Sequence, residues 1–126
     1  MNIGSRKNRS RINEYETRLV GLYQEYYDKS EWRGKWATEG GGVLINQGIH
    51  TIDLLAWIMG PIDEIWGRTN TLAHRIEVED LAIGCLKFRS GALGTIQAST
   101  ATYPGFPTAL EIYGTDGCAK IEGASL

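Results

Sequence analysis

The sequence predicts an α+β domain with a largely antiparallel β-sheet. Two observations support this fold class. Apolar residues recur at helical spacing between Gly42 and Met59, and the chain after Pro61 alternates between short turns and segments rich in β-branched and aromatic residues. The chain has 126 residues, which is about the length of one domain. We therefore expect one domain in which a helix precedes, and packs against, a set of strands.

An arm, a helix and a loop are expected before the central helix. Residues 1–12, MNIGSRKNRSRI, are polar and basic, as is typical of a disordered arm. From Ile12 to Tyr26 the apolar residues recur at helical spacing, which predicts a helix. The next segment, YYDKSEWRGKW, is expected to be a loop whose tryptophans cover the edge of the core. The helix prediction rests on Ile12, Tyr15, Leu19, Leu22 or Tyr23, and Tyr26.

The central helix is predicted from Gly42 to Met59, within the stretch EGGGVLINQGIHTIDLLAWIMGP. Gly60 supplies the positive φ that ends many helices, and Pro61 cannot continue one. One apolar stripe is expected to face the core, and it consists of Ile45, Ile49, Ile52, Ala56 and Met59. A second stripe aligns Asn46, His50, Asp53 and Trp57. From the spacing alone, this second stripe is either part of a site or an ordinary amphipathic surface on which His50 bonds to Asp53.

Five strands are expected after Pro61: IDEIWGRTNTL, VEDLAIGCLKF, ALGTIQASTAT, TALEIYG and CAKIEG. The segments RSGA and GTDGC are typical of hairpin turns, because Gly supplies the positive φ that such turns need. In EDLAIGCLKF both alternating sets are mostly apolar, which predicts a central strand covered on both faces. In ALGTIQASTAT one of the two alternating sets of side chains forms a flat, mildly polar face, which suits either a partner sheet or solvent. This set is Leu93, Thr95, Gln97, Ser99 and Ala101.

The composition argues against several classes of function. The net charge of −2 gives no basic field that would attract nucleic acid or an acidic membrane surface. No apolar run is long enough to span a membrane, and no apolar segment of a secretion signal follows the first charges, so we expect a cytoplasmic protein. Cys85 and Cys118 lie far apart and form no CxxC pair, which favours reduced, buried thiols.

No complete nucleotide-binding or metal-binding motif is present. Neither a GxGxxG segment after a strand nor a GxxxxGK[ST] loop occurs. The glycines at 40–42 either let a helix N-terminus approach a ligand closely or form a plain turn. The possible metal ligands have no second pair of defined spacing, so no metal site is expected; they are His50, Asp53, His74, Glu77, Glu79 and Asp80.

Four segments occur in an order and spacing that resembles the carboxy-terminal domain of the Gfo/Idh/MocA oxidoreductases: EWRGKW, GGGVLINQGIHTIDLLAWIMGP, VEDLAIGCLKFRSGALGTIQAST and LEIYGTDGCAKIEG. The resemblance covers about residues 26–123 and implies an open, mostly antiparallel sheet with a long helix packed on one face. The residues before it do not fit, because family members normally have a strand there. On this basis residues 1–25 are an atypical segment, and residues 26–126 are the substrate and oligomerisation domain.

The resemblance also implies a site. His50 matches the helix histidine that faces the substrate hydroxyl and the nicotinamide and moves a proton together with a lysine. Asn46 stands where other members carry Asp; an Asp would raise the basicity of the histidine, whereas Asn acts only by hydrogen bonds. Trp32 and Arg33 match the loop that lines the pocket, and Asp53 fits a role in fixing the tautomer of the histidine.

The function implied by the resemblance is that of an NAD(P)-dependent oxidoreductase acting on a sugar, polyol or related hydroxy compound. This chain would supply substrate binding and homo-oligomerisation through its sheet. The sequence lacks the Rossmann domain and the family's lysine, so we expect the chain alone to hold no NAD or NADP and to be inactive. The alternative is a non-catalytic binding module that dimerises through its sheet. A Rossmann domain supplied by a partner chain or an upstream reading frame would distinguish the two.

Overall fold

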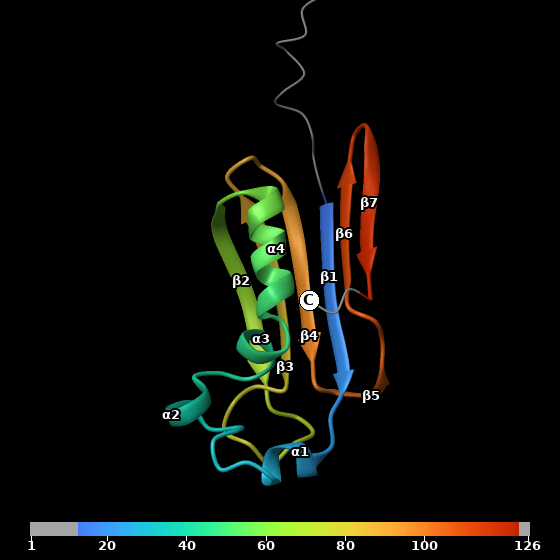
Figure 1. Ribbon diagram of the computed structural model, residues 1–126. Coiled ribbons are helices and arrows are strands. Elements are labelled where there is room, and N and C mark those ends of the chain that lie inside the picture. Colours follow the sequence, from blue (N-terminus) through green and yellow to red (C-terminus); the bar gives the residue numbers. More distant parts are fainter. Residues whose placement is uncertain (1–12, 124–126) are drawn as a thin grey trace, which may run out of the picture.

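The computed structural model describes residues 13–123, which form a seven-stranded sheet with helices on one side (Figure 1). The strands lie in the order β2-β3-β4-β1-β6-β7, and β5 pairs with β1 off this path. The pairing of β1 with β4 is parallel and the other pairings are antiparallel, so the predicted α+β class with a mostly antiparallel sheet is confirmed. The strands are β1 Asn13–Gly21, β2 Ile62–Asn70, β3 Leu81–Phe88, β4 Leu93–Ser99, β5 Ala101–Gly105, β6 Ala109–Gly114 and β7 Gly117–Glu122.

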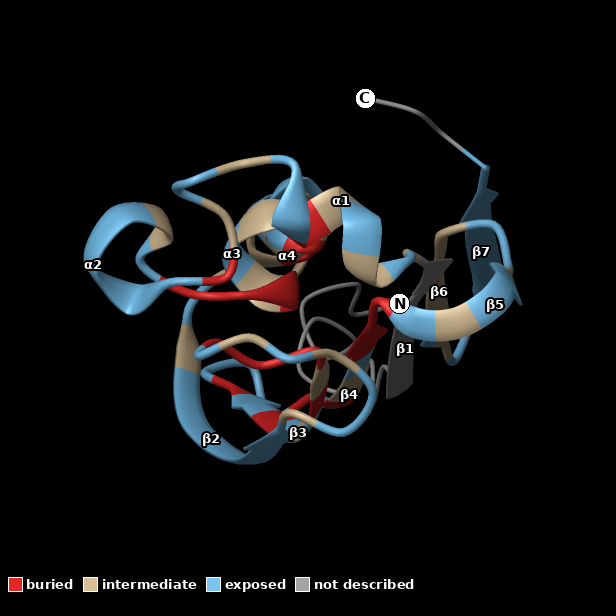
Figure 2. Ribbon diagram, turned by 90° about the horizontal axis from the view of Figure 1, so that it is seen from below, coloured by how far each residue is buried: buried red, intermediate tan, exposed pale blue. Residues whose placement is uncertain are grey.

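Helices cover one face of this sheet, as the view along the strands shows (Figure 2). The longest helix, α4, runs along the sheet, and α1 and α2 lie beyond one end of the strands (Figure 1). The helices are α1 Gln24–Asp28, α2 Trp36–Glu39, α3 Val43–Asn46 and α4 Ile49–Met59. Within residues 13–123 no helix is long and apolar enough to cross a membrane.

Strand β1 occupies the middle of the sheet, where the sequence pattern predicted a helix. Its backbone pairs in parallel with β4 on one side and antiparallel with β6 on the other. The helix prediction is therefore wrong over residues 13–21, and of the described part of the predicted range only residues 24–26 are helical, in α1. The spacing of four between Tyr15 and Leu19 fits the strand period of two as well as the helical period, and pairing with two neighbours decides between them.

Two further predictions concern this end of the chain. The disordered arm expected over residues 1–12 lies outside the described residues. The division of the chain at residue 25 stays a prediction, although β1 belongs to the same sheet as the strands that follow it.

The helix predicted over 42–59 is interrupted at Gln47 and Gly48, between α3 and α4. The N–H of Gly48 donates to the carbonyl of Val43, five residues back, at 2.8 Å. The turn therefore holds one residue more than a regular α-helical turn. This extra residue rotates the two halves relative to each other. Leu55 is fully buried, whereas Ile45 and Ile49 are exposed, so the predicted core stripe is wrong at those two isoleucines.

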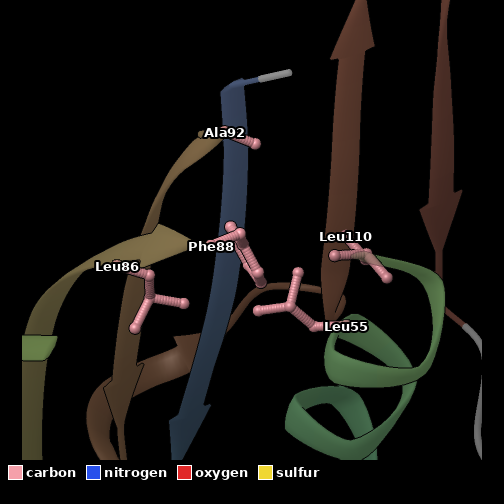
Figure 3. Packing of buried hydrophobic residues seen from close by; sticks show 5 residues of the cluster. All are labelled: Leu55, Leu86, Phe88, Ala92 and Leu110. Atoms are coloured by element: carbon pink, nitrogen blue, oxygen red, sulfur yellow. The ribbon is translucent and has the colours of Figure 1, made fainter. Parts of the chain in front are cut away.

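The main core lies between α4 and the sheet. Leu55 of α4 packs against a buried cluster from β3, the following turn and β6, formed by Leu86, Phe88, Ala92 and Leu110 (Figure 3). A second cluster of Val43, Ala82 and Ala98 fixes α3 against β3 and β4. Burying a leucine-sized side chain contributes about 1.5–3 kcal/mol. The two clusters together therefore hold both halves of the interrupted helix on the sheet.

The other face of the sheet carries no helix within residues 13–123 (Figure 2). In β3, Ala82 and Leu86 face the helices and are buried, whereas Ile83 and Cys85 point the other way and are exposed. The prediction that this strand is covered on both faces is therefore wrong for this chain. Cys85 and Cys118 are free, as expected, but both are exposed, so the prediction of buried thiols is also wrong.

The predicted helix end and hairpin turns are confirmed. Gly60 ends α4 with φ +81°, and Gly91 has φ +89° in the turn between β3 and β4. The strand predicted over residues 92–102 is divided at Thr100 into β4 and β5. Thr100 donates its N–H to the Asp80 carbonyl, while its own carbonyl accepts the N–H of Leu22. These bonds turn the chain away from the sheet at the end that carries α1.

Candidate functional site

The N-terminus of α3 is occupied by a carboxylate of the chain itself. Glu79 is buried, and its carboxylate oxygens accept the N–H groups of Gly42 at 2.9 Å and Leu44 at 3.2 Å. A Cβ on Gly42 would lie 1.9 Å from the Glu79 carbonyl oxygen, so only glycine fits there. The glycine run therefore admits Glu79 to the helix end, where a negative charge is favourable. Of the two interpretations of the glycines at 40–42, the approach of this helix end to a ligand therefore gains no support.

A second carboxylate joins the loop before α2 to α3. Glu39, the last residue of α2, accepts the N–H of Gly34 through Oε2 and the side-chain amide of Asn46 through Oε1. The residue next to Arg33 and the end of α3 are thus tied to one side chain. The sequence reasoning missed Glu39. Its only signal was its position at the start of the quoted EGGGVLINQGIH stretch, and local spacing does not connect it to Gly34.

Arg33 is held by two aromatic rings. The centre of its guanidinium lies 4.2 Å from the ring centroid of Tyr26 and 5.0 Å from that of Trp32, which are cation–π distances. Its Nη1 donates to the Tyr26 carbonyl at 3.4 Å. Its Nε is buried and has no hydrogen-bond partner among the described residues. Arg33 and Trp32 therefore form one unit, and this unit retains an unused donor.

His50 and Asp53 lie on α4, directly after the wide turn at Gly48. Both side chains are exposed, and no hydrogen bond joins them within the described part of the chain. The interpretation in which His50 bonds to Asp53 on an ordinary amphipathic surface therefore gains no support. The roles of His50 and Asp53 stay predictions. The turn also separates Asn46 from His50, so the four residues of the predicted second stripe do not share one continuous helix.

Two of the other residues considered as possible metal ligands, His74 and Asp80, have structural roles. Asp80 is completely buried and accepts the N–H groups of Leu72, Ala73 and His74 together with the ring Nδ1 of His74 at 3.0 Å. The second ring nitrogen of His74 lies 2.8 Å from the Leu22 carbonyl. The His74 ring is therefore held between a carboxylate and a backbone carbonyl. Within residues 13–123 no group of three or more His, Cys, Asp or Glu side chains could hold a metal ion.

The pKa of Asp80 reflects these contacts. Burial alone would raise the pKa of this carboxyl, but the three backbone N–H groups and the His74 ring hold it below its ordinary value. In the same region the Tyr27 hydroxyl lies 3.0 Å from Thr100 Oγ1, and burial raises the pKa of Tyr27. The loop over residues 71–80 is therefore fixed to Leu22 just after β1, to Gln24 of α1 and to Thr100 just after β4, and it presents Glu79 to α3.

The fold and the family match together define the class of this chain, which is that of an oxidoreductase C-terminal domain. The family described as "GFO/IDH/MocA C-terminal domain" matches residues 11–120. The chain belongs to the Gfo/Idh/MocA family of oxidoreductases. This finding confirms the resemblance inferred from the four sequence segments, and it extends the match to β1.

Several relatives have dehydrogenase names. The chain is 33% identical over 91 residues to D-apiose dehydrogenase of Rhizobium rhizogenes and 30% identical over 82 residues to myo-inositol 2-dehydrogenase of Thermotoga maritima. These matches cover 68% and 61% of this chain, and 26% and 25% of the relatives. The chain thus spans about a quarter of the length of the curated relatives it matches.

A solved structure extends this comparison. The WlbA dehydrogenase from Bordetella pertussis, in complex with NADH and UDP-GlcNAcA, superposes with a TM-score of 0.85 at 39% sequence identity. The match covers 90% of this chain and 36% of that chain. At this identity and coverage, the matched part of WlbA is similar to this chain in sequence as well as in fold.

Proposed function

We propose that the complete protein is an NAD(P)-dependent oxidoreductase acting on a hydroxyl group of a sugar, polyol or related compound. This chain supplies the substrate side of the site and the contact between subunits. Family membership and the dehydrogenase relatives support the proposal. The described residues contain no βαβ unit with a glycine-rich phosphate-binding turn, so another part of the protein, or a partner chain, holds the dinucleotide.

His50 is the residue to which we assign the proton. When bound, nicotinamide takes up the hydride from the carbinol carbon, and the hydroxyl proton has to leave with it. The observation that carries the assignment is the exposed ring of His50, which no hydrogen bond engages within residues 13–123. A ring nitrogen of His50 is therefore open to accept the proton of a substrate hydroxyl.

Asn46 and Arg33 position the substrate in this proposal. The side-chain nitrogen of Asn46 donates to Glu39, which leaves the amide oxygen to accept a hydrogen bond from a substrate hydroxyl or from His50. Arg33, stacked on Trp32, presents donors to a hydroxyl, carboxylate or phosphate. Asp53 is placed to influence the orientation of the His50 ring from the next turn of α4.

The choice of substrate class is guided by sequence identity. The match to WlbA, crystallised with NADH and UDP-GlcNAcA, is 39% identical, compared with 33% and 30% for the apiose and inositol dehydrogenases. This difference favours a nucleotide-linked sugar acid as the first substrate to test. Free sugars and polyols remain within the same proposal.

The proposal is tested by supplying the dinucleotide-binding half. We expect the chain, fused to or coexpressed with a Rossmann domain of this family, to reduce NAD or NADP in the presence of a sugar or nucleotide-linked sugar, followed by absorbance of the reduced nicotinamide. The Rossmann domain alone is the control and should be inactive. A correctly folded fusion that binds cofactor but oxidises no member of the panel contradicts the proposal.

The isolated chain is expected to bind NADH at best in the millimolar range. The reason is that it lacks the glycine-rich βαβ turn whose N–H groups hold the pyrophosphate of a dinucleotide. Fluorescence titration of NADH with the chain measures this affinity, and the same titration with the fused protein provides the positive control. A micromolar dissociation constant for the chain alone would show that it contains a dinucleotide site.

We also propose that subunits associate through the uncovered sheet face. Residues directly opposite one another in an antiparallel pair point to the same face, and Ile83 lies opposite Gln97 while Cys85 lies opposite Trp66. Trp66, Ile83 and Leu93 are between 44% and 60% exposed. Exposed apolar side chains grouped on one face are typical of a surface that a protein partner covers.

Gln97→Lys is expected to weaken the association by placing a charge in the middle of this contact. Light scattering or sedimentation should then show a shift toward the monomer, with a several-fold higher dissociation constant. Ala73→Lys, at an exposed position in the loop between β2 and β3, adds the same charge elsewhere and should leave the association unchanged. A monomer both before and after the Gln97 change would mean that the face is solvated.

A further inference from the structure

We propose that the cleft beside α1 is an anion-binding site that holds the diphosphate of a nucleotide-linked substrate. The cleft has a volume of about 600 Å³ and lies between α1, the loop that follows it, and residues 75–77. The four cationic side chains at its wall are Lys29, Arg33, Lys35 and Arg75. The buried ring of Tyr27 also lines it. This volume falls in the range of small-molecule sites, and it exceeds what a single small ion needs.

The cleft cations differ from most others in the described part by having no ion pair. Elsewhere, Lys87 pairs with Glu64 at 2.9 Å, Arg89 with Asp63 at 3.1 Å, and Lys120 with Glu111 at 3.1 Å. No carboxylate within residues 13–123 pairs with any of the four cleft cations. Cations that are grouped but unpaired repel one another, and a bound anion removes this repulsion.

Three carboxylates also line the cleft, and two of them already accept hydrogen bonds. Asp28 accepts the side-chain amide of Gln24 at 3.0 Å, and Glu77 accepts the N–H of Trp36 at 3.2 Å. Glu31 is the third. The four cations therefore exceed the three carboxylates, so the cleft is net positive in a chain whose total charge is −2.

Arg33 supplies the directional part of the site. Its guanidinium is held against Tyr26 and Trp32, so it is already oriented before a ligand arrives. Its Nε is buried, so the donors that remain for an anion are those at the end of the guanidinium, of which Nη1 also donates to the Tyr26 carbonyl at 3.4 Å. A guanidinium binds two oxygens of one phosphate or carboxylate in a fork, while lysines contribute point charge. One fixed arginine with three further cations suits a group with several negative oxygens, as in a diphosphate.

The cleft is connected to the proposed reaction site through its wall. Gly34 lines the cleft, and its N–H donates to Glu39, which also accepts the amide of Asn46. A ligand anchored at Arg33 is therefore held by the same segment that is tied to the end of α3. The identification of the anion as part of the substrate rests on the proposed function, whereas binding of the anion itself can be measured without catalysis.

The test is a titration of the 126-residue chain with uridine diphosphate, in which calorimetry at low salt measures the binding. We expect measurable binding that weakens as salt rises. The double variant Lys35→Gln with Arg75→Gln should bind about tenfold more weakly, since it removes two attractive charges from the cleft. The matched control, Lys87→Gln with Arg89→Gln, removes the same charge at distant ion pairs and should bind as the unchanged chain does. Circular dichroism shows whether each variant is folded.

Further measurements distinguish a site for the substrate diphosphate from a cofactor site and from no site. Absence of uridine diphosphate binding, or equal weakening in both double variants, overturns the inference. ADP-ribose, which carries the diphosphate of the cofactor, should bind more weakly; equal or tighter binding would assign the cleft to the cofactor and overturn the inference. In the fused protein, oxidation of free sugars without any diphosphate binding leaves the proposed function intact and removes only this site. Diphosphate binding without any oxidation leaves the anion site intact and contradicts the proposed function.

Discussion

His50→Ala is expected to lower the rate of alcohol oxidation by about 10²–10⁴-fold in the protein completed with a dinucleotide-binding domain, because a positioned acid–base group contributes about that factor. The affinity for NAD or NADP should stay nearly unchanged, since the ring acts on the substrate hydroxyl. Steady-state kinetics with the best substrate of the panel, together with a cofactor titration, measures both quantities. The loss should appear in kcat and kcat/KM together, as is expected when an interaction made in the transition state is removed.

Asn46→Ala provides the comparison for this result. It removes a hydrogen bond and the link to Glu39 but no proton-accepting group, so its effect on kcat should be smaller than that of His50→Ala. Full activity of His50→Ala from about pH 6 to about pH 9 would contradict the assignment, because a protein without its proton acceptor should be slower throughout this range. The family's lysine, with solvent, would then have to move the proton.

The parts of the fold that could be predicted from the sequence are those set by neighbouring residues. Gly91 in RSGA and Gly60 before Pro61 need positive φ, and this requirement is visible in the sequence itself. The strands between such turns were located because β-branched and aromatic residues are concentrated in them, although the division at Thr100 was missed. The central strand β1 was missed, because its pairing with β4 and β6 joins segments that are far apart in the chain.

In the candidate site, too, contacts between residues far apart in the chain could not be predicted from the sequence. Asn46 and His50 were singled out by their spacing, whereas their proposed roles, and the choice of Trp32 and Arg33, came from a family resemblance. No spacing rule connects the loop at residues 32–34 to α3. The carboxylates that assemble the site, Glu39 and Glu79, act on backbone and amide groups many residues away. Glu79 reaches Gly42 across 37 positions of the sequence, so no periodic pattern reports the contact. The interruption at Gly48 was missed because a single glycine within an apolar pattern is compatible with a continuous helix.

Asp80 holds together the region from which the site is built. Its carboxylate accepts three backbone N–H groups and the His74 ring, and none of its side-chain surface is exposed. The adjacent residue, Glu79, caps α3. Loss of the Asp80 contacts should therefore loosen the loop over 71–80 and, with it, the position of Asn46 at the end of α3.

Asp80→Asn is accordingly expected to destabilise the fold by at least about 1–3 kcal/mol, the cost of leaving a buried hydrogen-bond donor without its acceptor. Urea unfolding followed by circular dichroism measures the change. Asp63→Asn, which breaks the exposed pair with Arg89 and makes the same chemical substitution, should cost less than about 1 kcal/mol.

The pKa of Asp80 in the folded protein lies below its ordinary value, so the contribution of its charge to stability is complete above about pH 4 and is lost as the pH falls through the folded pKa. The difference in stability between the unchanged chain and Asp80→Asn should thus shrink toward acid pH. Equal costs for the two variants, or a difference that is independent of pH, would show that Asp80 does not hold this region as a charged group.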